Sequence, residues 1–215
     1  MANSNFIVVW QTELEVGGVK NWDIHGQLFD SAGVKIGYQN TEFIVNNLNL
    51  PGDQTNPSIL PKKENGFVVI YTGVDSDTST GIYGQKFNEF GDHLEAEFHI
   101  NTHTTSLQQT IDGVRFVNLL DGNIVVFWDS NNQVHSTSLY DVFSQRYNVY
   151  MNPVGAETQV NIFTRSNQNI QDAKTLENGE YIVIWQSHDQ DVSTQYSIYG
   201  RIFRANGEPI SDTDI

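Results

Sequence analysis

The segment Ile82-Tyr83-Gly84-Gln85-Lys86-Phe87 decides the fold, because it returns in each quarter of the chain. Its counterparts begin at Ile24, Val142 and Ile198, which gives spacings of 58, 60 and 56 residues. A fixed period of this size indicates one supersecondary unit copied along the chain, with each copy burying its apolar face against its neighbours. The repeat therefore constrains the architecture before any residue is assigned a role.

Each repeat unit predicts four short β-strands. One is a continuous apolar run ending in an aromatic residue, such as Phe67-Val68-Val69-Ile70-Tyr71, and such runs are typical of strands buried on both faces. The Ile-Tyr-Gly-Gln strand follows, and its side chains alternate between two faces. Two weaker strands, for example Glu42–Asn46 and Pro57–Leu60, complete the unit. The chain is interpreted as a single repeat domain with units at residues 1–41, 42–96, 97–156 and 157–215.

Two kinds of connection join the predicted strands. Asparagine or aspartate followed by glycine predicts a two-residue type I′ hairpin turn, and these pairs are Asn65-Gly66, Asp121-Gly122 and Asn178-Gly179. A second set predicts type I turns with glycine in fourth place, namely Asp30–Gly33, Asn88–Gly91 and Arg204–Gly207. The other connections, which include Gln11 to Asp23, are long and polar. In a meander they gather at one end, where we expect the binding function.

These features predict an all-β protein, a β-propeller built from four-stranded antiparallel repeats of about 57 residues. Fourteen strands are predicted, so the chain holds about 3.5–4 blades. The ring closes within one chain with an incomplete blade, or two chains share a ring of seven blades. We favour the homodimer, because a shared ring leaves no open sheet edge.

Composition excludes several classes of partner and site. The formal net charge of -15 disfavours nucleic acid and anionic membrane surfaces. The chain has no cysteine, which excludes disulfides, zinc–thiolate sites and thiol nucleophiles. Residues 1–5 carry no basic region followed by an apolar run, so no secretory signal peptide is predicted. We expect a secreted or cell-surface protein exported by another route, and a cytoplasmic location stays open.

The repeat resembles a tandem repeat of large bacterial secreted and surface proteins, and the likeness covers nearly the whole chain. The matching residues include Gly66-Phe67-Val68-Val69, Trp185-Gln186-Ser187, Ile82-Tyr83-Gly84-Gln85, Glu42-Phe43-Ile44-Val45-Asn46 and Gln54-Thr55-Asn56-Pro57. Such repeats often accompany calcium-dependent adhesins and toxins, and propellers of similar blade design include lectins. The third unit departs most, because Val142-Phe143-Ser144 replaces Ile-Tyr-Gly.

Residues near the long connections are the predicted glycan ligands. Trp22 and Tyr196 precede Ile-Tyr-Gly-Gln strands and are candidates for stacking on a sugar ring. A recurrent amide or guanidinium can bond a sugar hydroxyl, or it can equally tie the backbone within a blade; these residues are Gln27, Gln85, Gln145 and Arg201. The aromatic residues that end the apolar runs are expected to be core.

Pairs of aspartates in two equivalent loops predict calcium as a cofactor. Calcium takes six to eight oxygen ligands, and alternating aspartates in a turn can supply several of them. The predicted ligands are Asp75, Asp77, Asp189 and Asp191. Solvated hairpin loops are the alternative, since neither loop has the glycine and the final glutamate of an EF-hand.

The function expected from the sequence is a non-catalytic, multivalent binding module for carbohydrate, lectin-like or adhesive. Weak identical sites on repeated blades gain avidity together. A structural or protein-interaction propeller of a larger secreted bacterial protein is the alternative. A small glycoside hydrolase is the third reading, because 26 acidic residues provide carboxylate pairs.

Overall fold

The computed structural model describes residues 4–16, 18–37, 40–47, 52–62, 66–75, 79–109, 113–134, 139–191 and 195–215. The named elements of this part are all β-strands. Within it, no helix is long and apolar enough to cross a membrane. The chain forms two compact units: unit 1 is residues 1–100 with 111–113, and unit 2 is residues 101–110 with 114–215.

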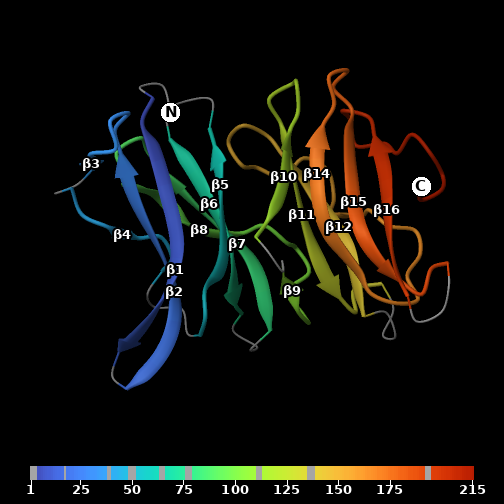
Figure 1. Ribbon diagram of the computed structural model, residues 1–215, viewed down its shortest axis with the longest axis horizontal. Helices are drawn as coiled ribbons and strands as arrows, with labels where there is room; N and C mark the ends of the chain where they lie inside the picture. The colour runs from blue at the N-terminus through green and yellow to red at the C-terminus, as the bar shows by residue number, and fades with distance from the viewer. Residues whose placement is uncertain are drawn as a thin grey trace. The chain divides into compact units, whose positions relative to one another are not determined.

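Unit 1 holds two antiparallel sheets, drawn from blue to green in Figure 1. The first consists of β1 (Phe6–Val16), β2 (Val19–Phe29), β3 (Lys35–Ile36) and β4 (Phe43–Ile44), and both β3 and β4 pair with β2. The second has the order β5-β6-β7-β8 and consists of β5 (Thr55–Pro61), β6 (Phe67–Val74), β7 (Thr80–Phe87) and β8 (His93–His99). Strand β5 contacts β1 and β2, so the second sheet begins against the first.

Unit 2 repeats this plan (Figure 1). The third sheet consists of β9 (Gln108–Gln109), β10 (Arg115–Asn118), β11 (Ile124–Asn131), β12 (Tyr140–Tyr147) and β13 (Thr158–Gln159). The fourth consists of β14 (Gln168–Thr175), β15 (Tyr181–His188) and β16 (Tyr196–Phe203). Strand β14 contacts β10, β11 and β12. The antiparallel sheets confirm the all-β, propeller-type fold class that the repeat predicts.

Three of the four apolar runs that end in an aromatic residue form the core, as expected. The first run is the exception, because Phe6 and Val8 are exposed and Trp10 is only partly buried. Tyr71, Trp128 and Trp185 are all fully buried. In unit 1, Tyr71 belongs to a cluster that joins residues of the first sheet, such as Ile24, to the second. In unit 2, Trp185 and Phe127 belong to a cluster that joins the third and fourth sheets. A buried aromatic side chain removes ~150–250 Å² from water, so these contacts between sheets dominate the stability of each unit.

The turns at the Asn-Gly and Asp-Gly pairs are not the predicted two-residue type. The amide of Gly122 donates to the carbonyl of Leu119, and in the pair Asp121-Gly122 the glycine has a positive φ of 85° while the aspartate does not. Asn178-Gly179 has the same hydrogen-bond pattern. A type I turn followed by one left-handed residue gives a three-residue loop, which needs only one residue at positive φ. Asn65 of the third pair lies outside the described residues.

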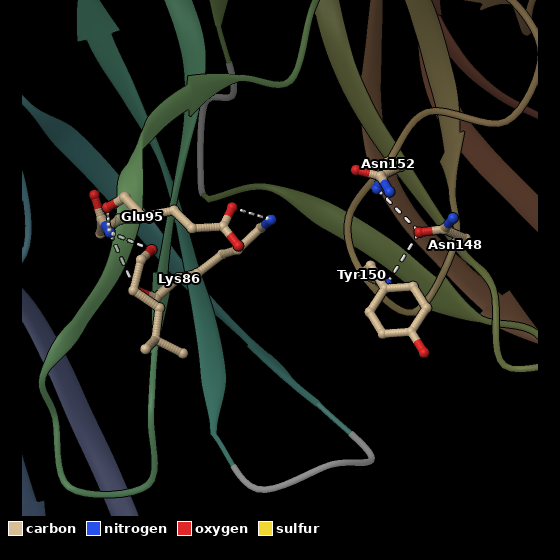
Figure 2. Close-up of polar contacts among 7 residues, drawn as sticks. Lys86, Glu95, Asn148, Tyr150 and Asn152 are labelled. Carbon is tan, nitrogen blue, oxygen red and sulfur yellow. Dashed lines mark hydrogen bonds and ion pairs between the residues drawn. The ribbon is translucent and has the colours of Figure 1, made fainter.

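The second set of turns is stabilised by its first side chain. Figure 2 shows Asn148, whose Oδ1 accepts hydrogen bonds from the backbone amides of Tyr150 and Asn152, each at 3.0 Å. Asp30 and Asn88 make the same pair of bonds in the first and second sheets. These bonds satisfy amides that the turn leaves unpaired, which explains why Asp or Asn stands first in three of the four sheets. In the fourth sheet Arg204 stands first, and Asn206 Oδ1 accepts a hydrogen bond from the amide of Glu208 at 3.0 Å.

The prediction of a long loop from Gln11 to Asp23 is wrong. Strands β1 and β2 continue as one hairpin, with Phe6 paired to Phe29 at one end and Val16 paired to Val19 at the other. The corresponding hairpins of the other sheets are shorter, and each of their strands is 8 residues long. The periodic apolar signal stops at Trp10, so the extension, held by backbone pairing, carries no such pattern in the sequence.

Candidate functional site

A hollow of about 470 Å³ lies beside β8 in unit 1. Its lining comes from β4 and the residues that follow it, from β7 and from β8: Ile44, Asn46, Asn47, Gln85, His93, Glu95, Ala96 and Glu97. The volume is within the range of about 300–1,000 Å³ that is usual for pockets that bind small ligands. Glu95 and Glu97 are the two acidic residues of this lining, and we call the space the β8 hollow.

A β-bulge lies where β8 carries these two glutamates. The pairing of β8 with β7 shifts register between Gly84 and Lys86. Glu95 has a positive φ of 63°, a conformation that residues other than glycine rarely adopt. The side-chain amide of Gln85 donates to the carbonyls of Leu94 and Glu95 at 3.4 Å each. The bulge is therefore held from the neighbouring strand.

The equivalent position in the first and third sheets is glycine. Gly155 has a φ of 77° and accepts a hydrogen bond from Gln145 at 3.4 Å, as Glu95 does from Gln85. Gly37 of the first sheet has a φ of 105°. Glycine adopts this conformation without strain, whereas a residue with a Cβ does not. Strained residues and bulges concentrate at functional sites, so the glutamate at position 95 points to a role for its carboxylate.

Lys86 of β7 holds Glu95 in its ionised form. Figure 2 shows the Lys86 Nζ reaching the Glu95 carboxylate, at 2.8 Å. The hydrogen bond from Lys86, and then its charge, lower the pKa of Glu95 below its usual value, with a smaller contribution from Lys62. An opposite charge at hydrogen-bond distance favours the charged form of a carboxyl group. Glu95 is thus a carboxylate at neutral pH.

Glu97, two residues along the strand, has the opposite environment. Its side chain is half-buried, and burial raises the pKa of Glu97 above its usual value. The backbone amide of Asn47 donates to Glu97 Oε2 at 3.3 Å and opposes this shift. Removal from water disfavours the charged form, so Glu97 keeps its proton to a higher pH than an exposed glutamate does.

The position of Glu97 also has a structural role in the repeat. In unit 2, Glu157 accepts a hydrogen bond from the amide of Thr102 at 2.7 Å, and Asp214 accepts one from the amide of Ile162 at 3.3 Å. A carboxylate at this position therefore binds the amide that follows the recurrent asparagine of the Glu-Phe-x-Val-Asn segment. In the β8 hollow this carboxylate has Glu95 beside it, which adds a chemical capability to the structural one.

The two glutamates have pKa values that are shifted in opposite directions. Two carboxyl groups whose environments move their pKa values apart are the arrangement by which one acts as acid and the other as base or nucleophile. His93, with its Nε2 2.9 Å from the carbonyl oxygen of Ile44, borders the same hollow.

The recurrent polar residues predicted as sugar ligands bond the backbone of the sheets. Gln27, Gln85 and Gln145 are buried, and each donates its amide to the carbonyl of the following residue at 2.8 to 3.1 Å. Arg201 donates to two backbone carbonyls of unit 2 at 3.0 Å. The structure therefore gives these side chains the framework role that the sequence left open. Gln85 in addition lines the β8 hollow.

The two aromatic candidates are accessible. Trp22 of β2 is 37% exposed, and its backbone amide donates to the carboxylate of Asp53 at 2.9 Å. Tyr196 at the start of β16 is 58% exposed, and its ring centroid lies 4.6 Å from that of His188. Trp22 belongs to unit 1 and Tyr196 to unit 2. A stacking role for either ring stays a prediction.

The first predicted calcium loop uses Asp75 for packing. Asp75 is buried, accepts a hydrogen bond from the Tyr83 hydroxyl at 2.5 Å and lies 3.6 Å from Nε2 of His99. Its carboxylate fills the space beside Gly81, where a Cβ would lie 2.9 Å from Asp75 Oδ1. Asp77, the other predicted ligand of this loop, lies outside the described residues.

The second predicted calcium loop has ordinary polar contacts. Asp189 lies 3.0 Å from Nδ1 of His188. A hydrogen bond to the Asp191 carboxylate raises the pKa of Tyr199 to about 12. The described residues contain no group of three or more His, Asp or Glu side chains arranged to hold a metal ion. Calcium binding at these loops stays a prediction.

Sequence analysis missed a fully buried carboxyl group at Asp129 of β11. Its Oδ1 accepts a hydrogen bond from the amide of Ile170 at 2.8 Å, and its Oδ2 contacts the Asn169 amide at 3.4 Å. Burial raises the pKa of Asp129 to about 7, although these bonds and the charge of Arg115 oppose the shift. In unit 1 the same contact is neutral, because Gln11 accepts from a backbone amide of β5 at 2.9 Å. Asp129 therefore ties β11 to β14.

No protein-family model and no curated protein matches this sequence. Solved structures do match the fold. The GH93 alpha-L-arabinofuranosidase of Fusarium graminearum in complex with arabinobiose gives a TM-score of 0.54 at 12% identity, over 90% of this chain and 59% of that one. The alpha-L-arabinanase of Penicillium chrysogenum complexed with arabinobiose gives 0.52 at 12% identity, over 94% and 65%. A thermostable family-43 glycoside hydrolase gives 0.51 at 9% identity, over 97% and 73%.

The class defined by the fold is therefore the β-propeller of the kind found in glycoside hydrolases. At 9–12% identity the likeness shows the fold alone. The chain spans less than two thirds of the length of the arabinofuranosidase and the arabinanase.

These matches correct the functional prediction from the sequence. A non-catalytic lectin-like or adhesive module was expected, but the three similar structures described above are all those of glycoside hydrolases. The expectation of no enzymatic activity is overturned by the same finding. The sequence offers 26 acidic residues but does not show which of them lie close together, so it could not favour the glycoside hydrolase reading.

Proposed function

We propose that this chain is a carbohydrate-active domain that hydrolyses glycosidic bonds in the β8 hollow. Glu97 acts as the general acid, and Glu95 acts as the ionised carboxylate. The observation that carries the proposal is the opposite shift of two pKa values on one strand: burial raises that of Glu97, while Lys86 lowers that of Glu95. Both carboxyl groups line the same hollow of about 470 Å³.

The reaction uses each group in the form that its environment favours. Glu97 donates its proton to the glycosidic oxygen while the bond to the anomeric carbon breaks. Glu95 removes a proton from the attacking water or attacks the anomeric carbon itself. The amide of Asn47 then stabilises the carboxylate that Glu97 becomes, because the 3.3 Å hydrogen bond strengthens as charge develops. If Glu95 has taken the proton of the attacking water, solvent removes that proton and returns one to Glu97. If Glu95 has formed a bond to the anomeric carbon, a water molecule gives its proton to Glu97, attacks that carbon and breaks the bond to Glu95, which completes the cycle.

The proposed substrate is an arabinose-containing glycan. The arabinofuranosidase and the arabinanase described above were both solved with arabinobiose, so arabinan and aryl arabinofuranosides are the first substrates to assay. The net charge of -15 favours a neutral polysaccharide over a polyanion. A location outside the cell suits such a substrate and remains part of the proposal.

Two carboxyl-to-amide variants test the assignment. Glu97→Gln and Glu95→Gln should each lower kcat by ~10²–10⁴-fold, which is the usual contribution of acid–base catalysis. Glu157→Gln is the matched control, because Glu157 makes the same amide contact in unit 2 and has no part in the hollow. Equal losses of activity in Glu97→Gln and Glu157→Gln would show that Glu97 is only structural. Wild-type protein that cleaves neither substrate would contradict the proposed function.

Self-association is the second part of the proposal. Ile24 and Val142 are fully buried within their units, but their counterpart Ile198 on β16 is 64% exposed. Likewise Phe67 is buried, whereas its counterpart Phe6 on β1 is 45% exposed. Each exposed face has the same apolar pattern as a face that a neighbouring sheet covers elsewhere in the chain. We propose that a second copy of the chain covers them.

A further inference from the structure

A second hollow, of about 300 Å³, lies in unit 2 between the third and fourth sheets. Ser144 and Arg146 of β12 and Thr158 of β13 form one side, and Tyr181 and Phe203 of the fourth sheet contribute to the other. We call this space the β12 hollow. It belongs to one compact unit and is separate from the β8 hollow, which unit 1 contains.

In unit 1 an aromatic ring fills the equivalent space in both sheets. A Cβ at Gly26 would lie 2.7 Å from the ring of Phe43, so the ring covers the glycine directly. The second sheet repeats the arrangement, with a Cβ at Gly84 placed 2.7 Å from the ring of Phe98. The Gly-and-Phe pair is thus the normal filling of this part of the repeat.

The third sheet replaces both members of the pair with hydroxyl residues. Ser144 stands at the glycine position, Thr158 stands at the phenylalanine position, and their hydroxyl oxygens are 3.1 Å apart. The ring is lost and two polar groups take its place. This substitution creates the volume and the polarity of the β12 hollow.

A buried hydrogen-bond donor borders the hollow. Arg146 stands where the first sheet has Leu28, and its Nη2 is paired with the carboxylate of Asp121. Its Nε is shielded from solvent and has no hydrogen-bond partner among the described residues. The ion pair with Asp121 holds the guanidinium at the edge of the hollow, where it adds a polar wall.

The remaining wall is aromatic. The rings of Tyr181 and Phe203 are stacked with centroids 5.2 Å apart. Burial raises the pKa of Tyr181 to about 12, against the nearby charge of Arg146, so its hydroxyl stays protonated. An apolar wall beside two hydroxyl groups matches a sugar ring, which has C–H bonds on its face and hydroxyl groups at its edge.

We propose that the β12 hollow is a second saccharide-binding site that takes one neutral sugar residue. The ring lies against Tyr181 and Phe203, and the hydroxyl groups of Ser144 and Thr158 bond the sugar hydroxyls on the other side of the hollow. A volume of about 300 Å³ admits one residue of a chain. An anion fits less well, because Asp121 already pairs with the guanidinium and the net charge is -15. The site is independent of the proposed catalysis.

Titration by nuclear magnetic resonance tests this site. The protein carries Glu97→Gln so that no probe is cleaved, and the probes are arabinobiose, methyl arabinofuranoside and glucose. The amides of Gly155 and Gly207, which line the hollow, should shift in a saturable way with at least one probe. Ser144→Gly combined with Thr158→Phe restores the ring of the other sheets and should weaken this binding at least ~10-fold, because the ring occupies the volume of the sugar.

The possible results separate this site from the catalytic one. Arg146→Leu, which copies Leu28 of the first sheet, should also weaken binding while leaving the circular dichroism spectrum unchanged. Hydrolysis by the chain with an intact Glu97 should be unaffected by either change. Absence of shifts at both glycines with every probe would overturn the proposal. So would unchanged affinity in the filled variant.

Discussion

Asp129→Asn should remove a large pH-dependent loss of stability from unit 2. Asp129 is fully buried, and its pKa is raised from 3.8 to about 7. The folded state therefore holds this proton more tightly than the unfolded state does. The stabilisation is present below the unfolded pKa and is lost as pH rises through the folded value. Stability should fall between about pH 4 and pH 7.

The size of the effect follows from the shift. One pKa unit corresponds to about 1.4 kcal/mol, so a rise from 3.8 to about 7 is worth at most about 4 kcal/mol. Asparagine keeps an acceptor for the amide of Ile170, which donates to Asp129 at 2.8 Å. It cannot ionise, and the neutral Gln11 makes the equivalent contact in unit 1. The variant should therefore be the more stable protein above pH 7.

Urea denaturation at several pH values, with hydrogen exchange of the Ile170 amide as a local probe, measures this difference. The free energy of unfolding of the wild type, relative to Asp129→Asn, should decrease by about 1.4 kcal/mol per pH unit within the window. Other titrating groups are common to both proteins and cancel. Asp212→Asn, at an exposed position of unit 2, is the control and should follow the wild type. Parallel curves for wild type and Asp129→Asn would refute the reasoning.

Three further predictions concern the proposed site and assembly. Glu95→Gly restores the glycine of the repeat and should raise the melting temperature while lowering kcat by ~10²-fold or more. Gly155→Ala, at the equivalent position with φ 77°, should lower the melting temperature. Unchanged activity in Glu95→Gly would remove Glu95 from the mechanism. The wild-type kcat/KM should fall on the alkaline side as Glu97 loses its proton, and on the acidic side as Glu95 gains one; a profile without the alkaline fall would contradict the acid role. Light scattering should give the mass of more than one chain for the wild type and of one chain for Ile198→Glu, because a charge on the exposed apolar face opposes its burial; a monomeric wild type would end the proposal of self-association.

The repeat made much of the fold predictable. Burial of Tyr71, Trp128 and Trp185 follows from continuous apolar runs, because only strands covered on both faces tolerate them. The turn positions at Asp30–Gly33 and Asn88–Gly91 follow from Asp or Asn in first place and glycine in fourth. The turn type at Asp121-Gly122 could not be predicted from the sequence, because turns with one left-handed residue and turns with two favour similar residues.

The candidate site was not predicted, although a signal for half of it was present. Glu95 stands where Gly37 and Gly155 stand in other units. This equivalence depends on the β-bulge, which shifts the register of the strand, so the sequence alone does not align the three residues. Glu97 reads as a member of the Glu-Phe-x-Val-Asn pattern, which is its structural role. Its raised pKa comes from burial beside Asn47, a residue 50 positions earlier in the chain.

The amino-acid sequence by itself determined the period, the strands and the apolar faces, because these depend on local alternation and on the repetition of one unit. The tertiary structure decided which carboxyl groups are solvated and which are not. Glu97, Asp129 and Asp75 are ordinary acidic residues in the sequence, and each becomes distinct only through the sheet that covers it. The free energy of a charge depends on its distance from water and from other charges, and those distances are set by packing between sheets.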